Sequence, residues 1–180
     1  MKKLFFVVFI LSASCSDLRM KPKVTTHQYF DMASFMQTQI ATLEKSTYTV
    51  RKNTTANGIS DKSVAEKIDW KQELAIFAEV DINKPVLKDM YLARYGKNFV
   101  EYEAIEKNAK VQRLYVAGGK DAPTQIKVSW IDENQLYQSK KDLEIVLQNN
   151  KITKYGIIGE QKIIFKEPLQ YTILGEILYK

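Results

Sequence analysis

The stretch I-K-V-S-W, residues 126–130, carries the pattern that decides the fold of this chain. Ile126, Val128 and Trp130 are apolar, whereas Lys127 and Ser129 between them are polar. Side chains of a β-strand point alternately to its two faces, so the stretch predicts a strand with one face against a core and the other in water. Such half-buried strands are typical of antiparallel sheets.

Segments with strand-like patterns recur on both sides of this stretch. They are residues 99–105, 111–117, 143–147, 152–158, 162–166 and 171–179. The alternation in 99–105 does not decide which of its faces is the inner one. Gly118-Gly119 and Asn149-Asn150 predict turns between neighbours. Short connections place consecutive strands side by side, so we predict an antiparallel meander of about seven strands over residues 97–180.

The first half of the chain favours helices. Apolar residues recur at helical spacing from Tyr29 to Leu43, behind a capping box that starts at Thr25. Residues 46–55 are rich in β-branched side chains and predict one strand. Capping signals at Ser63 and Asp69 predict a second helical region over 63–80, and residues 87–93 a short third one. We therefore expect an α+β domain with N-terminal helices, about residues 25–94, packed on the C-terminal sheet.

The first fourteen residues predict an export signal. Lys2 and Lys3 precede an uninterrupted apolar run over residues 4–11, and small residues follow over 12–14. A positive start, a short apolar run and small residues before a cut are typical of a secretory signal peptide. The apolar run is far shorter than the roughly 20 residues that a helix needs to span a bilayer.

Cys15, the only cysteine, follows these small residues directly, and this arrangement resembles the lipobox of bacterial lipoproteins. The resemblance implies that residues 1–14 are removed and that Cys15 carries acyl chains such as palmitate. These chains would anchor the protein to a membrane of the cell envelope. Residues 15–24 would form a flexible tether, and 25–180 a single α+β domain.

The residue after Cys15 is Ser16, and Asp17 stands one further on. A Cys-Asp retention signal for the inner membrane is therefore not matched. This favours the outer membrane of a Gram-negative cell, facing the periplasm, over the inner membrane.

Charge argues against a nucleic-acid partner. The formal net charge is +6, and removal of Lys2 and Lys3 lowers it to +4. Nucleic-acid binding requires basic residues gathered in a patch with interleaved aromatic residues. The remaining lysines are instead scattered along the chain.

No pattern in the sequence specifies a chemistry. His27 is the only histidine, so neither a zinc site nor a nucleophile–histidine pair is expected. Asp81-x-Asn83 lacks the other ligands of a calcium loop. The carboxylate pairs Glu101/Glu103 and Asp132/Glu133 fit a solvated surface better than a glycosidase site. We expect no catalytic residues, no metal, no cofactor and no enzymatic activity.

Two binding functions follow from these expectations. In the first, the domain is an accessory module that binds a protein partner in the envelope, with aromatic side chains as anchors. In the second, the sheet and the helices form a cup that carries a lipid or another apolar ligand. The sequence thus resembles small lipoproteins of bacterial envelopes, and Cys15 is its one assigned site residue.

Overall fold

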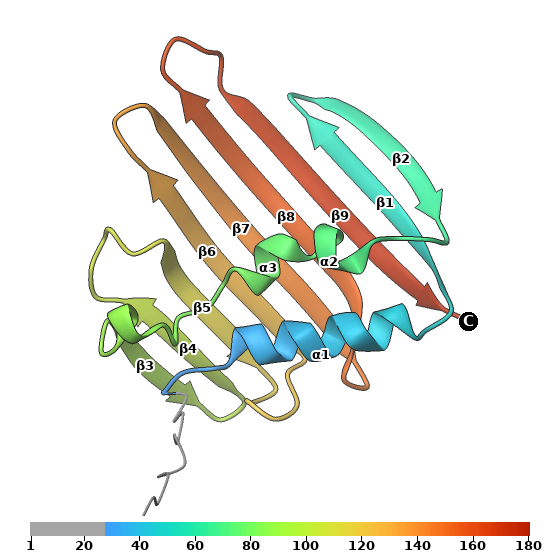
Figure 1. Ribbon diagram of the computed structural model, residues 1–180, viewed down its shortest axis with the longest axis horizontal. Coiled ribbons are helices and arrows are strands. Elements are labelled where there is room, and N and C mark those ends of the chain that lie inside the picture. The colour runs from blue at the N-terminus through green and yellow to red at the C-terminus, as the bar shows by residue number, and fades with distance from the viewer. Residues whose placement is uncertain (1–27) are drawn as a thin grey trace, which may run out of the picture.

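Nine strands form one antiparallel sheet in residues 28–180, the part of the chain that the computed structural model describes. The order across the sheet is β2-β1-β9-β8-β7-β6-β5-β4-β3, so β2 and β3 form its two edges (Figure 1). The strands are β1 (Tyr48–Ala56), β2 (Ile59–Ala65), β3 (Tyr91–Gly96), β4 (Phe99–Ala104), β5 (Val111–Ala117), β6 (Gln125–Glu133), β7 (Tyr137–Gln148), β8 (Lys151–Ile163) and β9 (Leu169–Tyr179).

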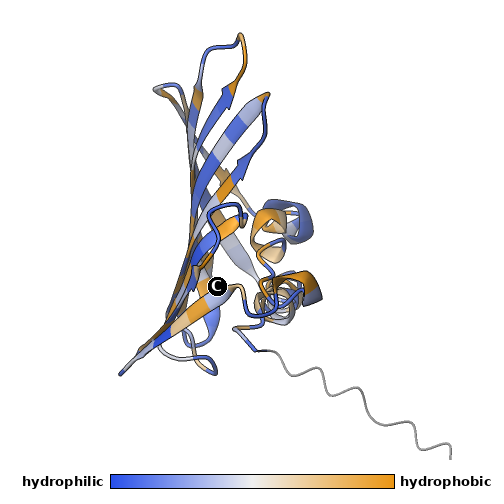
Figure 2. Ribbon diagram, turned by 90° about the vertical axis from the view of Figure 1, so that its left-hand side faces the viewer, coloured by the Kyte–Doolittle hydropathy of each residue, from blue (hydrophilic) through white to orange (hydrophobic). Residues whose placement is uncertain are grey.

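Short helices cover one face of this sheet and leave the other face bare (Figure 2). They are α1 (Met32–Glu44), α2 (Trp70–Glu73), α3 (Ala75–Ala78) and the 3₁₀ helix η1 (Pro85–Leu87). The core between helices and sheet, all nine strands and all four helices lie within residues 28–180. We therefore expect this segment, which holds the core and the described secondary structure, to fold by itself.

Helix α1 begins at Met32 because Asp31 caps it: the Asp31 side chain accepts a hydrogen bond from the Ser34 backbone N–H at 3.0 Å. Met32, Met36 and Leu43 are fully buried against the sheet. Gln39 is buried among them, donates to the Asn150 carbonyl at 2.9 Å and accepts from the Ile152 N–H at 3.3 Å. These two bonds fix α1 on the β7–β8 hairpin.

Helix α2 is held by one aromatic residue and one carboxylate. Trp70 is buried, and its Nε1 donates to the Tyr48 hydroxyl at 2.7 Å. The Glu73 carboxylate accepts from the Tyr155 hydroxyl at 2.7 Å and from Lys52 Nζ at 2.9 Å. Burial and the Glu73 carboxylate raise the pKa of Tyr155 well above its usual value. The cluster ties α2 to both β1 and β8.

The helices cross the lower and middle parts of the sheet in Figure 1, and the strand ends above them have no helix beside them. We call these strand ends and loops, residues 55–60, 133–138 and 160–170, the open end. None of its residues is buried, whereas Val50, Ile145 and Ile152 under the helices are fully buried. The sheet therefore divides into a covered region and an open end.

The expected fold class is wrong in its balance of helix and strand. The sheet has nine strands rather than about seven, β1, β2 and most of β3 come from the part expected at residues 25–94, and the helices are short. Residues 59–65 form edge strand β2, so residues 63–65 end a strand where the start of a helix was expected, because the Asn57-Gly58 turn folds this segment back onto β1. Every side chain of β2 except Ala65 is exposed, so the strand shows no apolar alternation in the sequence.

Three boundaries also differ from expectation. Residues 28–31 are not helical, so α1 starts later than predicted; the expected cap at Thr25 lies outside the described residues. Residues 91–96 form edge strand β3 where a short helix was expected through residue 93. The separate strand expected at 162–166 is instead the end of β8 and its turn into β9, because β8 continues unbroken past Gly159 to Ile163.

The pattern of residues 126–130 is confirmed. Ile126, Val128 and Trp130 are buried on the helix-covered face. The strand at 46–55 corresponds to β1, and the strands from β3 to β9 pair consecutively as a meander. The inner face of the ambiguous strand at 99–105 is that of Val100 and Tyr102, which are 2% and 0% exposed.

Candidate functional site

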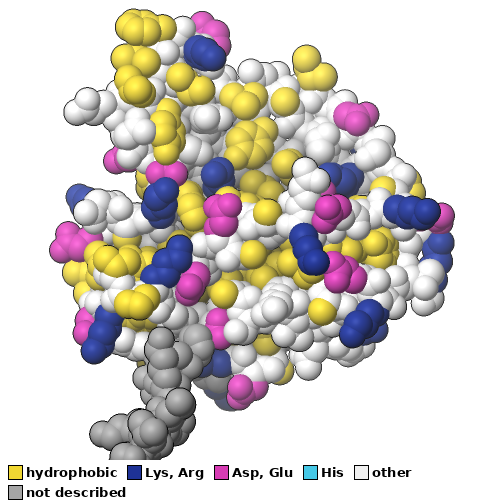
Figure 3. Space-filling view, viewed as in Figure 1, with side chains coloured by type: hydrophobic (Ala, Val, Ile, Leu, Met, Phe, Trp, Pro, Cys, Tyr) yellow, Lys and Arg dark blue, Asp and Glu magenta, His cyan; other side chains and the backbone are white. Residues whose placement is uncertain are grey.

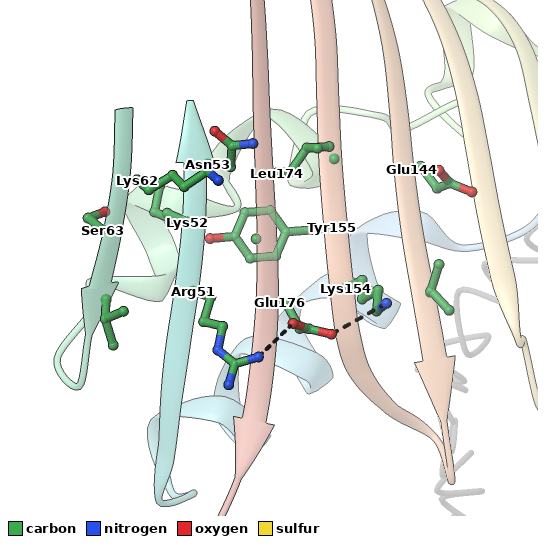
Figure 4. Close-up of a pocket in the computed structure, with 14 residues that line it drawn as sticks. Arg51, Lys52, Asn53, Lys62, Ser63, Glu144, Lys154, Tyr155, Leu174 and Glu176 are labelled. Atoms are coloured by element: carbon green, nitrogen blue, oxygen red, sulfur yellow. Dashed lines mark ion pairs between the residues drawn. The ribbon is translucent and has the colours of Figure 1, made fainter. Parts of the chain in front are cut away.

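A depression of about 550 Å³ lies on the sheet face that the helices leave bare. It crosses the sheet from β2 to β7, and Figure 4 views it from this side, with the helices behind the strands. Its volume falls within the range of about 300–1,000 Å³ that is usual for small-molecule sites.

Gly156 on β8 forms the floor, because it brings no side chain to this face. Its neighbour on β9 is Leu174, and a Cβ at position 156 would lie 3.2 Å from Leu174 Cδ2. Leu174 is 45% exposed, and Val64 on β2 is 68% exposed. Val146, which faces the same way from β7, adds a third apolar wall. The site is thus an apolar trough across the strands.

Basic side chains form part of the rim of this trough. Glu176 lies between Arg51 and Lys154, with N–O distances of 3.6 Å and 3.4 Å (Figure 4). Lys62 on β2 forms no ion pair with any residue that the structure describes, so its ammonium group is free to meet an anion. An apolar floor with an unpaired cation at the edge suits an amphipathic anion.

Asn53 provides a polar atom at the same site. It lies on β1 directly opposite Leu174, and its Oδ1 is buried. Within residues 28–180 no group donates a hydrogen bond to that oxygen. A buried acceptor without a donor costs free energy, which a hydroxyl or amide of a bound molecule would recover.

The two predicted residues of the N-terminal part lie outside the described residues. Cys15, the predicted lipid-attachment site, and His27 both precede Gln28, the first described residue. Acylation of Cys15 therefore stays a prediction. Among residues 28–180, no three or more His, Cys, Asp or Glu side chains group in a way that would hold a metal ion.

Glu101 and Glu103 lie on the bare face, as expected for residues two apart on one strand. Both are engaged by arginines: Glu101 pairs with Arg113, Glu103 pairs with Arg94, and Arg94 Nη1 also lies 3.9 Å from Glu101. The structure brings these carboxylates together with cations and at a distance from the trough, which they do not line.

Asp132 and Glu133 point to opposite faces of β6, because successive residues of a strand alternate. Lys110 Nζ donates to Asp132 at 2.9 Å, and this hydrogen bond holds the pKa of Asp132 below its usual value. Glu133 accepts from Gln138 Nε2 at 2.7 Å. The structure therefore does not place this pair around a common substrate.

Three turn motifs have structural roles in the described chain. Gly118 and Gly119 form a turn with φ angles of 85° and 90°. Asn149 and Asn150 form the predicted β7–β8 hairpin turn with φ angles of 51° and 60°. Asn83, from the Asp81-x-Asn83 motif, accepts from the Tyr29 N–H at 2.9 Å and donates to the Phe30 carbonyl at 3.0 Å, so it holds the segment before α1.

Sequence reasoning missed the trough. Its lining residues come from five strands between positions 51 and 176, and the pairing of β1 with β9 brings them together. A local signal is Gly156, a glycine inside strand β8, because a glycine within a strand often marks a place where something approaches the backbone closely.

No family model, no curated protein and no solved structure matches this chain. No helix within residues 28–180 is long and apolar enough to cross a membrane.

Proposed function

We propose that this protein binds an amphipathic molecule, with an apolar body and an anionic group, in the trough on the bare face of its sheet. The observation that carries the proposal is the apolar trough over Gly156, where an exposed strip of apolar side chains meets an unpaired lysine. The role is binding or carriage and involves no chemical step.

The site differs in place from the cup expected between sheet and helices. Met32, Met36, Trp70, Leu74 and Phe77 fill the space beneath the helices, and each is at most 1% exposed. An apolar ligand there would have to displace closely packed side chains, at a cost of several kcal/mol. The trough requires no such displacement.

The proposal includes the location that the lipobox-like signal implies. We propose that Cys15 is acylated and anchors the domain to the outer membrane, facing the periplasm. A Cys15→Ala variant should accumulate as a precursor that incorporates no labelled palmitate, and normal acylation of that variant would contradict the anchor.

The ligand proposal is tested on residues 28–180 with dansyl-labelled undecanoic acid as an anionic apolar probe. Gly156→Leu fills the floor, and we expect it to weaken probe binding at least about tenfold, because its side chain occupies the space that the apolar body of the probe needs and so removes the contact area available to it. Thr49→Leu is the matched control, since it adds the same side chain to the same face outside the trough. Equal binding by wild type and Gly156→Leu would refute the trough as the site.

The anionic group is tested with Lys62→Glu. We expect this variant to weaken binding of the fatty acid several-fold and to leave binding of the corresponding fatty alcohol unchanged. Mass spectrometry of an organic extract of the periplasmic protein then identifies the natural ligand. An equal loss for acid and alcohol would show that Lys62 contributes packing rather than charge.

A second candidate, binding of a protein partner, is favoured by the edge strand β2. This strand pairs only with β1, and its Ile59 and Val64 are 79% and 68% exposed. A free edge of this kind is where an extended peptide adds as a further strand. Crosslinking from position 61 in the envelope would capture such a partner, and a proline introduced elsewhere in β2 should abolish the crosslink.

A further inference from the structure

The β6–β7 and β8–β9 connections and the adjoining strand ends carry an exposed apolar cluster at the open end, which we call the apolar tip: Leu136, Ile163, Ile164, Phe165 and Leu169. Phe165 is 98% exposed, Leu136 is 63% and Ile164 is 49%. Hydrophobic side chains gather at this end in the space-filling view, above the helices (Figure 3). Soluble surfaces carry single exposed apolar residues, whereas contiguous clusters mark interaction sites.

The backbone at Phe165 adopts a rare conformation that leaves the side chain exposed. Its φ is +60°, a conformation that bulky residues rarely adopt. The turn is fixed on both sides: the Lys166 N–H donates to the Ile163 carbonyl at 3.0 Å, and the Ile164 N–H donates to the Leu136 carbonyl at 2.9 Å. The second bond joins the β8–β9 connection to the β6–β7 connection, so the apolar tip is one assembled surface.

Charged residues flank the apolar tip in the pattern of an interfacial anchor. Lys162 and Lys166 stand on either side of Ile163, Ile164 and Phe165. Lys162 is paired with Glu160 at 3.1 Å, and no described carboxylate pairs with Lys166. Apolar residues that enter the acyl region, with lysines at the headgroup level, are the arrangement found at membrane surfaces.

We propose that the apolar tip inserts into a lipid bilayer. The tip lies at the opposite end of the sheet from residues 28–31, where the chain enters the described domain (Figure 1). A contact of the tip with lipid would therefore lie at the end of the domain away from the point where the chain enters it. The inference does not rest on the proposed ligand, because Leu136, Ile164 and Phe165 do not line the trough.

The test uses residues 28–180 and vesicles of phosphatidylethanolamine with phosphatidylglycerol. We expect the domain to cosediment with these vesicles, and Phe165→Ser to lower its partitioning at least about tenfold, because it removes the most exposed ring. Tyr95→Ser is the matched control: Tyr95 is 69% exposed on β3, away from the tip. Equal partitioning by wild type and Phe165→Ser would overturn the proposal.

A fluorescence measurement separates insertion from other contacts. Trp70 and Trp130 are 1% and 7% exposed, so an indole introduced by Phe165→Trp reports on the tip above a buried background. Its emission should shift to the blue on addition of vesicles and be quenched by brominated acyl chains, whereas that of Tyr95→Trp should not. A blue shift that grows with protein concentration without vesicles would assign the tip to self-association and overturn the lipid proposal.

Discussion

The covered region and the open end belong to the same strands but differ in what holds them. In β8, Ile152 and Tyr155 are at most 2% exposed beneath the helices, whereas Ile163, at the end of the same strand, is 36% exposed. The ladder of hydrogen bonds continues through both parts, since β8 pairs with β7 as far as Ile163. Pairing therefore sets the length of the sheet, and packing against helices sets where its side chains are buried. In the strands that reach the open end, buried and exposed apolar residues lie in different parts of the same strand.

The largest expected difference between the two regions concerns aromatic truncation. Trp70→Ala removes a buried ring that contacts Tyr48 and Tyr155, and should lower the free energy of unfolding by about 3–5 kcal/mol. Phe165→Ser at the open end should change it by no more than about 0.5 kcal/mol. Denaturant unfolding of both variants measures this contrast, and a similar loss for both would mean that the open end is part of the cooperative core.

A pair of glycines sharpens the comparison between the two faces of the sheet. A Cβ at Gly175 would lie 2.1 Å from the Tyr155 ring, which Glu73 holds in place, whereas the atom nearest to one at Gly156 is Leu174 Cδ2 at 3.2 Å. Gly175→Ala should therefore cost about 1–3 kcal/mol of unfolding free energy by overpacking, and Gly156→Ala much less. Thermal unfolding of the two variants tests this, and equal costs would show that Tyr155 moves aside.

The smallest effect we predict is the response of a buried tyrosine to high pH. Burial, together with neighbouring Tyr29, raises the pKa of Tyr91 to about 12. The unfolded chain, in which the tyrosine pKa is near 10, loses this proton at a lower pH than the folded protein does. The contribution of Tyr91 to the free energy of unfolding is therefore complete below about pH 10 and is lost as pH rises toward 12. The slope from one proton is at most about 1.4 kcal/mol per pH unit.

The check is the pH dependence of unfolding for wild type and Tyr91→Phe. The variant should lose stability less steeply between about pH 10 and 12. Its neutral-pH stability provides the control, because the substitution also removes the hydrogen bond from Tyr91 to the Val111 carbonyl. Parallel curves over the alkaline range would contradict the raised pKa.

The same contrast explains which parts of the fold were predictable from the sequence. Ile126, Val128 and Trp130 alternate with polar residues because only one face of β6 is covered by helices. A strand covered on one face can be recognised in the sequence by this alternation. β2 lies at an edge and has no buried face, so I-S-D-K-S-V-A offers no period to read. Asp31 and Asp69 cap helices through hydrogen bonds to residues nearby in the sequence. Sequence reasoning predicts the cap at Asp69 but not the one at Asp31, because the capping box at Thr25 predicts an earlier start for the same helix.

The candidate site was predictable only in part, for a related reason. Glu101 and Glu103 share a face because they are two apart on one strand, which sequence spacing alone specifies. The trough depends on the register between β1 and β9, where Asn53 meets Leu174. The Glu73–Tyr155 contact likewise joins residues 82 positions apart. Nothing local in the sequence encodes such distances.

The pairing of β1 with β9 also determines when the sheet can be completed during synthesis of the chain. Tyr48 pairs with Tyr179, so the neighbour of β1 is the last of the nine described strands to be synthesised. Until then the β1–β2 hairpin has a free inner edge, and the Lys52–Glu73–Tyr155 cluster lacks the sheet that positions it. Contacts over such separations make folding slow, because long loops must close first. A chain built in this way cannot complete its sheet until the strand that joins its two ends in space has left the ribosome.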